Sequence, residues 1–253
     1  SSNRIEGVTA PRERVEALVM RPTTPANRSE QEIAGYRDAL NLIHESASDM
    51  AFSVNVILQL HSMLYRFQAG FGGRWKMAPN EIVEQTPDGT VHRGRFTPVT
   101  PVATPQAMDD LVAGYRQAMD AERESLVVVP LAILDFLCIH PFTDGNGRVA
   151  RLLSLLLLYH FDVAVGRYIS LERVIEESKE TYYDSLTASS RGWHEGRHDP
   201  HPWLNYFWGM LLAAYKEFEE RVGALKDAPG AKTALVEQAV RRRVKPFAIT
   251  DIE

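Results

Sequence analysis

The feature that most constrains this chain is a short polar segment, residues 140–151 (HPFTDGNGRVAR), set between two apolar runs. Residues 131–139 (LAILDFLCI) precede it and residues 152–158 (LLSLLLL) follow it. Apolar runs of this kind are expected to be buried helices of the core. A polar loop held between two buried helices indicates that the loop itself carries a function.

The residues of this loop suit an anion. Gly145, Asn146 and Gly147 can adopt glycine-favoured dihedrals, so that successive backbone N–H groups point to one place. The helix that starts just after them adds free N–H groups and the positive end of its dipole. Arg148 and Arg151 fall on neighbouring faces of its first turn, where two guanidinium groups can reach phosphate oxygens. The pattern therefore predicts a polyphosphate site.

Two more residues predict chemistry at this site. Asp144 offers a hard oxygen ligand of the kind that a Mg²⁺ ion bridging phosphates requires. His140, placed just past the preceding helix, can accept a proton at neutral pH. The alternative is that Asp-Gly and Asn-Gly are ordinary turn dipeptides and that the arginines are solvated surface charges.

The segment resembles the Fic-domain signature H-P-F-x-D-G-N-G-R-x-x-R at every specified position. The resemblance implies an all-α fold, a Fic-type helical bundle with one β-hairpin. It also implies a bacterial protein adenylyltransferase, a nucleotidyltransferase that moves AMP from ATP to a Ser, Thr or Tyr hydroxyl of a target protein or of itself, with Mg²⁺ as cofactor. The matching residues are His140, Pro141, Phe142, Asp144, Gly145, Asn146, Gly147, Arg148 and Arg151.

The same resemblance implies a role for each position. His140 is expected to accept the hydroxyl proton while the oxygen attacks the α-phosphorus, and Asp144 to hold Mg²⁺ against the α- and β-phosphates. Residues 145–147 are expected to stabilise the α-phosphate oxygens, Arg148 the β-phosphate and Arg151 the γ-phosphate.

Two aromatic features have competing interpretations. Phe142 is expected to anchor the loop in the core rather than touch substrate. Tyr182 and Tyr183 lie where the family has residues that line the nucleotide base pocket, and aromatic contact suits a purine. Ordinary packing of the two tyrosines is the alternative.

The first residues of the chain resemble a second family motif, the inhibitory sequence S/T-x-x-x-E-G/N of autoinhibited Fic proteins, through Ser2, Glu6 and Gly7. A carboxylate placed against the second motif arginine would neutralise it and fill the space of its phosphate partner. Glu6 is therefore expected to inhibit the enzyme by pairing with Arg151. A plain helix-terminal glutamate is the alternative.

Helical spacing of apolar residues predicts helices along most of the chain. A capping box of Ser29 and Glu32 is expected to open one of them, Thr104 to cap another, and Pro130 to open the helix that delivers His140. The predicted helices span residues 12–20, 30–46, 53–66, 104–122, 130–139, 148–161, 168–177, 180–190 and 202–222.

A β-hairpin is predicted where helical spacing is lost. Ile82–Gln85 and Val91–Phe96 are rich in β-formers and flank Pro87-Asp88-Gly89. The alternative is a surface loop. In Fic domains the corresponding hairpin, the flap, covers the active site and holds the target segment by strand pairing.

Two histidine features compete with this interpretation. His194 to His198 spell HExxH, the zincin pattern, which requires both histidines on one face of a continuous helix. Gly196, Pro200 and Pro202 favour a loop instead. His61, alone on an amphipathic helix, is expected to be structural.

Composition narrows the setting. The net charge of −5 gives no reason to expect nucleic-acid binding by this chain, and its single cysteine, Cys138, excludes an internal disulfide. The first residues contain no apolar stretch of the signal-peptide type. We therefore expect a cytoplasmic protein without a membrane partner. The resemblance implies ATP and a hydroxyl-bearing protein as partners, and a homodimer as a further option.

The chain is expected to divide into a Fic domain and a short remainder. Residues 1–225 would form the Fic domain, with the inhibitory segment at 1–20 and the flap at about 75–100. Residues 226–253 would be a linker and the start of a C-terminal module cut off by the end of the chain, with a helix at 231–244 and a capping box of Thr250 and Glu253. The resemblance implies a winged helix for that module.

Three other functions stay open. The same site could transfer UMP or phosphocholine. A sub-branch of the family that phosphorylates its target departs from GNGR at the second glycine, so Gly147 keeps this chain's motif in the form of the AMP-transferring members. The enzyme could instead remove AMP, with Glu6 aligning a water molecule. A non-enzymatic alternative is an ATP-gated regulator.

Overall fold

The structure, a computed structural model, describes residues 1–20, 23–68, 70–80, 82–85 and 91–227. The predicted hairpin turn at 87–89, the linker from 228 onward, the tail helix at 231–244 and the capping box of Thr250 and Glu253 lie outside these residues.

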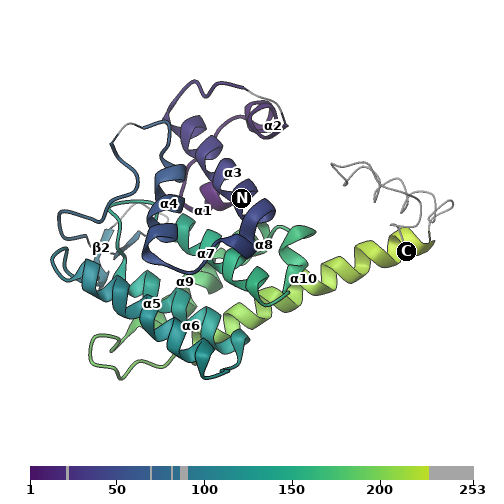
Figure 1. Ribbon diagram of the computed structural model, residues 1–253. Helices are drawn as coiled ribbons and strands as arrows, with labels where there is room; N and C mark the ends of the chain where they lie inside the picture. Colours follow the sequence, from purple (N-terminus) through teal and green to yellow (C-terminus); the bar gives the residue numbers. More distant parts are fainter. Residues whose placement is uncertain (21–22, 69, 81, 86–90, 228–253) are drawn as a thin grey trace.

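The described chain is all-α with a single β-hairpin, as predicted (Figure 1). Two short 3₁₀ helices, Ala47–Asp49 and Ala164–Arg167, join the longer elements. The α-helices and strands are α1 Ser2–Ile5, α2 Arg12–Met20, α3 Arg28–Ser46, α4 Val54–Leu64, β1 Ile82–Gln85, β2 Val91–Phe96, α5 Thr104–Asp120, α6 Ser125–Ile139, α7 Asn146–His160, α8 Leu171–Glu177, α9 Lys179–Ser190 and α10 His201–Asp227.

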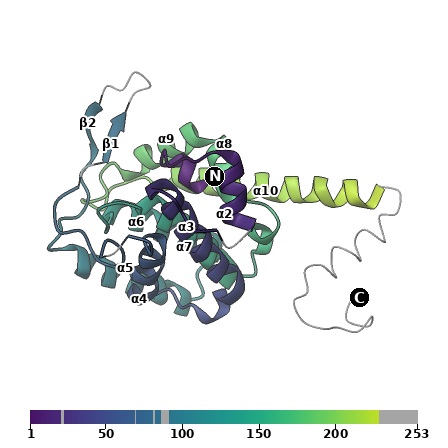
Figure 2. The same ribbon diagram turned by 90° about the horizontal axis from the view of Figure 1, so that it is seen from above.

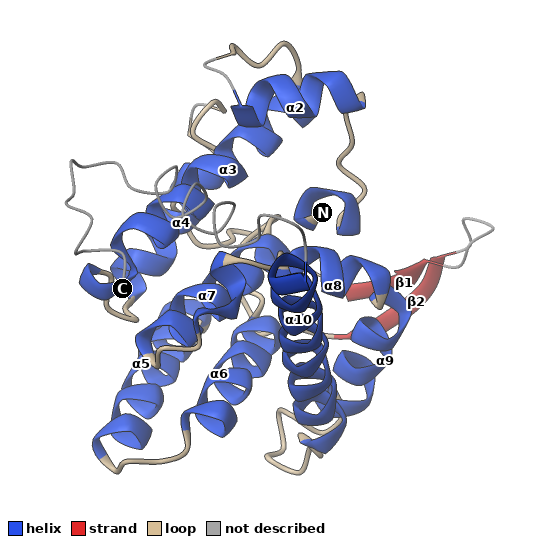
Figure 3. Cartoon of the chain, turned by 90° about the vertical axis from the view of Figure 1, so that its right-hand side faces the viewer, coloured by secondary structure: helices blue, strands red, loops and turns tan. Residues whose placement is uncertain are grey.

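Helix α7 is the centre of the bundle, because its sequence is apolar on every side after the first turn. It packs against α3 and α4 on one side and α6 on the other, an arrangement visible in Figure 3. The side chains of Leu152, Leu153, Leu156 and Leu157 are fully buried. The polar loop before α7 is therefore fixed to the most rigid part of the molecule.

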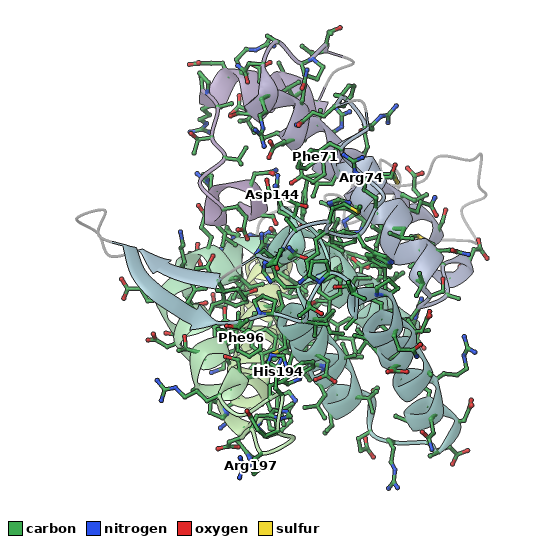
Figure 4. All side chains as sticks on the ribbon, turned by 90° about the vertical axis from the view of Figure 1, so that its left-hand side faces the viewer. Phe71, Arg74, Phe96, Asp144, His194 and Arg197 are labelled. Atoms are coloured by element: carbon green, nitrogen blue, oxygen red, sulfur yellow. The ribbon has the colours of Figure 1, made fainter. Side chains whose placement is uncertain are left out.

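The hairpin stands out from the helical body (Figure 2). Its strands are antiparallel, with Ile82 opposite Phe96 and Gln85 opposite Val91, and the register is irregular between residues 82 and 84. The ring of Phe96 stacks on that of His194 at a centroid distance of 5.3 Å (Figure 4). The predicted strands are thus confirmed, and the loop after α9 supports the base of β2.

Several predicted helix starts are wrong. The side chain of Asn27, not Ser29, caps α3 by accepting a hydrogen bond of 2.9 Å from the backbone N–H of Glu30. Thr104 is the first residue of α5 rather than its cap. Helix α7 begins at Asn146, two residues before the predicted start.

Pro130 lies inside α6 instead of opening it. A proline at this position removes the N–H that would bond to the carbonyl four residues earlier. That carbonyl, on Leu126, accepts a hydrogen bond of 2.7 Å from the indole N–H of Trp208. A donor from α10 therefore compensates the defect, and α6 starts five residues earlier than predicted.

The HExxH segment forms turns, as predicted, and Gly196 adopts a φ of 63°. Within the described ranges, no group of three or more His, Cys, Asp or Glu side chains is placed to hold a metal ion. The same ranges contain no helix long and apolar enough to cross a membrane.

Replacing Leu156 with alanine tests the central role of α7. Its side chain is fully buried, so Leu156→Ala should lower the free energy of unfolding by roughly 2–5 kcal/mol through lost burial and the cavity left behind. Leu212→Ala, at a position 56% exposed on α10, is the matched control and should change it by less than about 0.5 kcal/mol. Urea unfolding followed by circular dichroism measures both, and equal effects would contradict the assignment of α7 to the core.

Candidate active site

A pocket opens where α6 ends and α7 begins. Its volume of about 200 Å³ is below the roughly 300–1,000 Å³ usual for small-molecule sites. Side chains of α6 and α9 form an apolar wall, the base of the hairpin covers one side, and α1 closes another. The lining residues are Glu6, Ile82, Phe96, Leu134, Leu137, Cys138, His140, Gly147, Tyr182, Tyr183, Leu186 and Ser190.

His140 reaches this pocket from the C-terminal end of α6. Its backbone is left-handed, with φ 52° and ψ 60°, which ends the helix. Its ring Nδ1 lies 3.2 Å from the carbonyl oxygen of Leu137. A carbonyl only accepts, so Nδ1 carries the hydrogen and Nε2 keeps a free lone pair. Burial lowers the pKa of His140 to about 4, and the ring is therefore a neutral base at physiological pH.

The loop behind His140 is held by a stack of buried rings. The ring of Phe142, fully buried, lies parallel to that of His61 at 3.7 Å. His61 Nδ1 accepts a hydrogen bond of 2.9 Å from the backbone N–H of Gly73, so its Nε2–H donates to the carbonyl of Asp144 at 3.1 Å. Burial lowers the pKa of His61 to about 4, which keeps this neutral tautomer in place. Phe142 and His61 are thus structural, as expected.

Asn146 holds the loop through its side chain. Its side-chain oxygen accepts from the N–H of Phe142 at 2.9 Å, and its amide nitrogen donates to the carbonyl of Phe142 at 2.8 Å. The side-chain amide is therefore committed to loop geometry. What α7 can offer an anion is its N-terminal backbone N–H groups, which follow Gly145 at φ 85°.

Gly147 allows an unusually close approach. A Cβ atom at this position would lie 2.3 Å from Oε1 of Glu6 and 3.2 Å from Nη1 of Arg151. Any side chain here would collide with the carboxylate of Glu6. The first turn of α7 therefore leaves a space that an anionic group fills, and in this structure that group is Glu6.

The structure brings Arg151 and Glu6 together. Arg151 Nη2 lies 2.8 Å from Glu6 Oε1, and its Nε donates to Oγ of Ser2 at 2.6 Å. The remaining nitrogen, Nη1, is buried and has no hydrogen-bond partner among the described residues. It faces Gly147. A buried guanidinium with an unused donor beside a helix N-terminus is suited to a larger anion with several oxygens.

Three features of α1 place Glu6 at the pocket. The side chain of Ile5 is buried in the core. Arg4 forms an ion pair of 2.8 Å with Glu176 on α8. Gly7 takes a φ of 75°, and its N–H bonds to the carbonyl of Arg4 at 3.0 Å, which ends the helix directly after Glu6. All three residues of the N-terminal motif, Ser2, Glu6 and Gly7, thus contribute to this arrangement.

Arg148 is not brought to the pocket. Its side chain, 1% exposed, forms an ion pair with Glu32 of α3 and donates to the hydroxyl of Tyr65 at 2.6 Å. The two motif arginines therefore diverge instead of converging as the sequence suggested, because each pairs with a different helix. The expected contact of Arg148 with a β-phosphate does not fit this arrangement.

Asp144 presents a carboxylate that could hold a cation. Its side chain is 47% exposed, and its Oδ1 accepts from the N–H of Gly145 at 2.6 Å. The only described ion pair of its Oδ2 is with Arg28 at 3.8 Å. Mg²⁺ in phosphate sites is commonly bound by one or two carboxylates together with substrate phosphates and water. This donor chemistry fits Mg²⁺ as a partner of phosphate, with Asp144 as its protein ligand.

Tyr182 and Tyr183 both line the pocket, their rings 5.1 Å apart. Tyr182 is also part of the core, where its ring packs edge-on against Trp203 and Tyr206. Burial raises the pKa of Tyr182 to about 12. The two interpretations of this pair are therefore compatible, since one residue can be core on one side and pocket wall on the other.

Sequence reasoning missed three polar residues, of which Glu32 and Lys76 are buried and Asn80 is half-buried. Glu32 was assigned to a helix cap and instead pairs with Arg148. Lys76 and Asn80, in a stretch without periodicity, form hydrogen bonds to the backbone carbonyls of Ile139, His140 and Phe142. The position of Glu32 among the apolar residues of its helix could have indicated that its carboxylate is buried. No sequence signal marks the other two.

The chain is similar to known proteins over the part that contains this site. The model of the Fic/DOC family matches residues 51–158. A Fido domain-containing protein of Dictyostelium discoideum is 31% identical over 112 residues, which are 44% of this chain and 74% of that protein. The protein adenylyltransferases fic-1 of Caenorhabditis briggsae and Caenorhabditis elegans are 28% and 29% identical over 55% and 54% of this chain. The chain spans about a quarter of the length of these two relatives.

Solved structures share the fold. A Fic domain containing signaling protein from Bacteroides thetaiotaomicron aligns with a TM-score of 0.66 at 25% identity, covering 84% of this chain and 81% of that one. A Fic family protein from Desulfovibrio desulfuricans aligns with a TM-score of 0.69 at 24% identity, covering 87% of this chain and 62% of that one. The all-α fold is thus that of Fic domains.

Replacing Glu32 with glutamine tests the pairing of Arg148. The variant leaves a buried guanidinium without its carboxylate, which should lower the free energy of unfolding by roughly 3 kcal/mol. Glu16→Gln, in the exposed pair with Arg12, is the matched control and should cost less than about 0.5 kcal/mol. Chemical denaturation gives both values. A Glu32→Gln variant as stable as the control would show that the pair is dispensable.

Stability should fall as the pH drops from about 6.5 toward 5. The pKa values of His61 and His140 are lowered to about 4, so in this window the unfolded chain binds protons that the folded chain does not. His44, whose pKa burial also lowers, adds to the effect. His140→Ala should reduce the slope of unfolding free energy against pH by up to one proton. A slope equal to that of the unsubstituted protein in urea titrations would refute the buried neutral state of His140.

Proposed function

We propose, since the chain belongs to the Fic/DOC family, that it is a protein adenylyltransferase that moves AMP from ATP to a hydroxyl of a protein. The names of the two nematode relatives support this reaction. The observation that carries the proposal is a pocket lined by a neutral base, His140, by Gly147 at a helix N-terminus and by Glu6, which pairs with the buried Arg151.

The reaction needs a base, an oxyanion site and a leaving-group site. His140 Nε2 would accept the proton of the target hydroxyl while its oxygen bonds to the α-phosphorus. The bond from that phosphorus to the bridging oxygen would break, and pyrophosphate would leave. The backbone N–H groups of Gly145, Asn146 and Gly147 would stabilise the charge on the α-phosphate oxygens. Mg²⁺, held by Asp144, would supply positive charge to the phosphates.

From the α-phosphate beside His140, the base of ATP would extend to one side and the γ-phosphate to the other. The apolar wall of α6 and α9, with Tyr182 and Tyr183, would receive the base. Arg151, with its unused Nη1, would bind the γ-phosphate. For Arg148 we now propose a supporting role, in which its ion pair with Glu32 fixes the first turn of α7 to α3.

Glu6 would inhibit the reaction by occupying the γ-phosphate position. Its carboxylate bonds to Arg151 and fills the space that Gly147 leaves open. A pocket of about 200 Å³ with Glu6 in its wall is too small for a complete nucleotide by the usual range of ligand sites. Release of α1 would enlarge the pocket and free Arg151. The flap would then hold the target segment beside His140 by strand pairing.

Removal of AMP is the second candidate, because Glu6 and His140 line the same pocket. In that reaction Glu6 would align a water molecule for attack on the phosphorus of a modified side chain. Transfer of UMP would use the same groups with a different base against the tyrosines.

Glu6→Gly should raise self-modification or target modification at least about tenfold, because the substitution frees Arg151. His140→Ala in that background should abolish it, since no base remains to accept the proton. Transfer of radiolabel from α-labelled ATP, with mass spectrometry of the product, measures both and reports the added group. Glu16→Gly, on an exposed face of α2, is the control for loss of a carboxylate.

The outcomes separate the alternatives. Undiminished labelling in the His140→Ala variant would refute the role of His140. AMP release from a modified target that depends on Glu6 would favour the reverse reaction. Labelling from UTP in preference to ATP would change the nucleotide but not the mechanism.

A further inference from the structure

The backbone of His140 adopts a conformation that residues with side chains rarely take. Its φ of 52° and ψ of 60° place it in the left-handed region. The family motif requires a histidine here rather than a glycine, so other contacts must hold this conformation. Those contacts come from a short segment, residues 76–80, that lies directly before the hairpin.

Lys76 caps the end of α6. Its ammonium donates to the carbonyl oxygens of Ile139 at 3.1 Å and His140 at 2.9 Å. Its backbone N–H donates to the carbonyl of Pro141 at 2.9 Å. Lys76 is only 2% exposed, and among the described side chains no carboxylate forms an ion pair with it. A buried cation that meets carbonyls at a helix C-terminus is stabilised by those oxygens and by the helix dipole.

Asn80 completes the contact. Its side-chain oxygen accepts from the Lys76 ammonium at 2.9 Å. Its amide nitrogen donates to the carbonyl of Phe142 at 2.9 Å and lies 3.3 Å from that of His140. Together the two side chains bind the carbonyl groups on both sides of the catalytic histidine. The backbone carbonyls of residues 139–142 therefore each accept at least one hydrogen bond from Lys76 or Asn80.

The same two residues lead into the flap. Strand β1 begins at Ile82, two residues after Asn80, and Ile82 lines the pocket together with His140. A target segment paired with this hairpin would be positioned by β1, while the base that deprotonates it is positioned by α6. The segment 76–80 is hydrogen-bonded to the end of α6 and the residues after it, and it precedes β1 in the chain, so it links the two elements.

We infer that Lys76 and Asn80 are positioning residues that lock His140 in its left-handed conformation and fix its distance from the flap, so that the target hydroxyl meets Nε2. This inference rests on the proposed function, because it assigns the segment a role in aligning base and hydroxyl. Neither residue touches the nucleotide pocket, so the affinity for ATP should not depend on them. Misplacement of reacting groups by about 1 Å can cost roughly 100-fold in rate.

A charge effect distinguishes positioning from simple support of the fold. The charged groups that face His140 are Lys76, which lowers its pKa, and Glu6 and Asp144, which raise it. Loss of the ammonium in Lys76→Met should therefore raise the pKa of His140 and move the acidic limb of the kcat profile to higher pH. A residue that only stabilised the fold would leave this limb unchanged.

The experiment uses the Glu6→Gly protein as the parent and the transfer of AMP from α-labelled ATP to an unmodified protein hydroxyl, on the protein itself or on a target, as the assay. Lys76→Met and Asn80→Ala should each lower kcat about 10- to 100-fold, with the KM for ATP changed less than about twofold. Lys76→Arg keeps the charge and should retain most of the activity and the pH profile. Lys216→Met, at an exposed position on α10, is the matched control for loss of a lysine and should behave as the parent.

Two results would overturn the inference. One is a folded Lys76→Met protein with the kcat and the acidic limb of the parent. The other is a pKa of the His140 ring that is the same in Lys76→Met as in the parent, measured by NMR titration of the protein without nucleotide. The NMR titration needs no activity, so it tests Lys76 even if the parent transfers nothing, an outcome that would refute the proposed function alone. If Lys76→Met fails to fold, Asn80→Ala with a full kcat contradicts the inference instead.

Discussion

The first two turns of α7 contain two buried guanidinium groups, and each is paired with a carboxylate that offsets the cost of its burial. Arg148 pairs with Glu32 on α3, and Arg151 pairs with Glu6 at the end of α1. These two ion pairs attach α3 and α1 to the central helix. They differ in a way that matters for function. Glu32 is buried on a long helix with an ordinary core face, whereas Glu6 lies on a four-residue helix at the end of the chain. The pair of Arg148 and Glu32 is therefore suited to holding the fold, and the pair of Arg151 and Glu6 to replacement of its carboxylate by another anion.

Much of this fold could be predicted because it depends on local spacing. The apolar faces of α3, α4 and α7 and the alternation around 82–96 were legible, and the segment 140–151 identified the family. The errors occurred where a distant partner decides local structure. Pro130 does not end its helix because Trp208, far along the chain, satisfies the freed carbonyl. Glu32 follows a serine at capping distance, but the cap is Asn27 and the carboxylate is needed by Arg148.

The site itself was predicted unevenly for the same reason. A motif lists residue types without saying whether the side chain or the backbone acts. Asn146 contributes a side chain that builds the loop, and its backbone N–H is one of the groups at the N-terminus of α7. Arg148 belongs to the motif yet is enclosed by Glu32 and Tyr65. Lys76 and Asn80 belong to no motif, because their role arises only when the chain before the hairpin returns to the end of α6.

The gap beside Gly147 has a thermodynamic consequence. Under the proposed function, the Glu6 carboxylate and the terminal phosphate of ATP exclude each other from the same volume. Two mutually exclusive occupants are linked, so whatever loosens α1 tightens the apparent binding of ATP, and ATP in turn loosens α1. The ion pair of Arg4 with Glu176 and the burial of Ile5 stabilise α1 in place, and they therefore determine the equilibrium between Glu6 and the nucleotide. The cellular concentration of ATP would be one of the variables that this equilibrium senses.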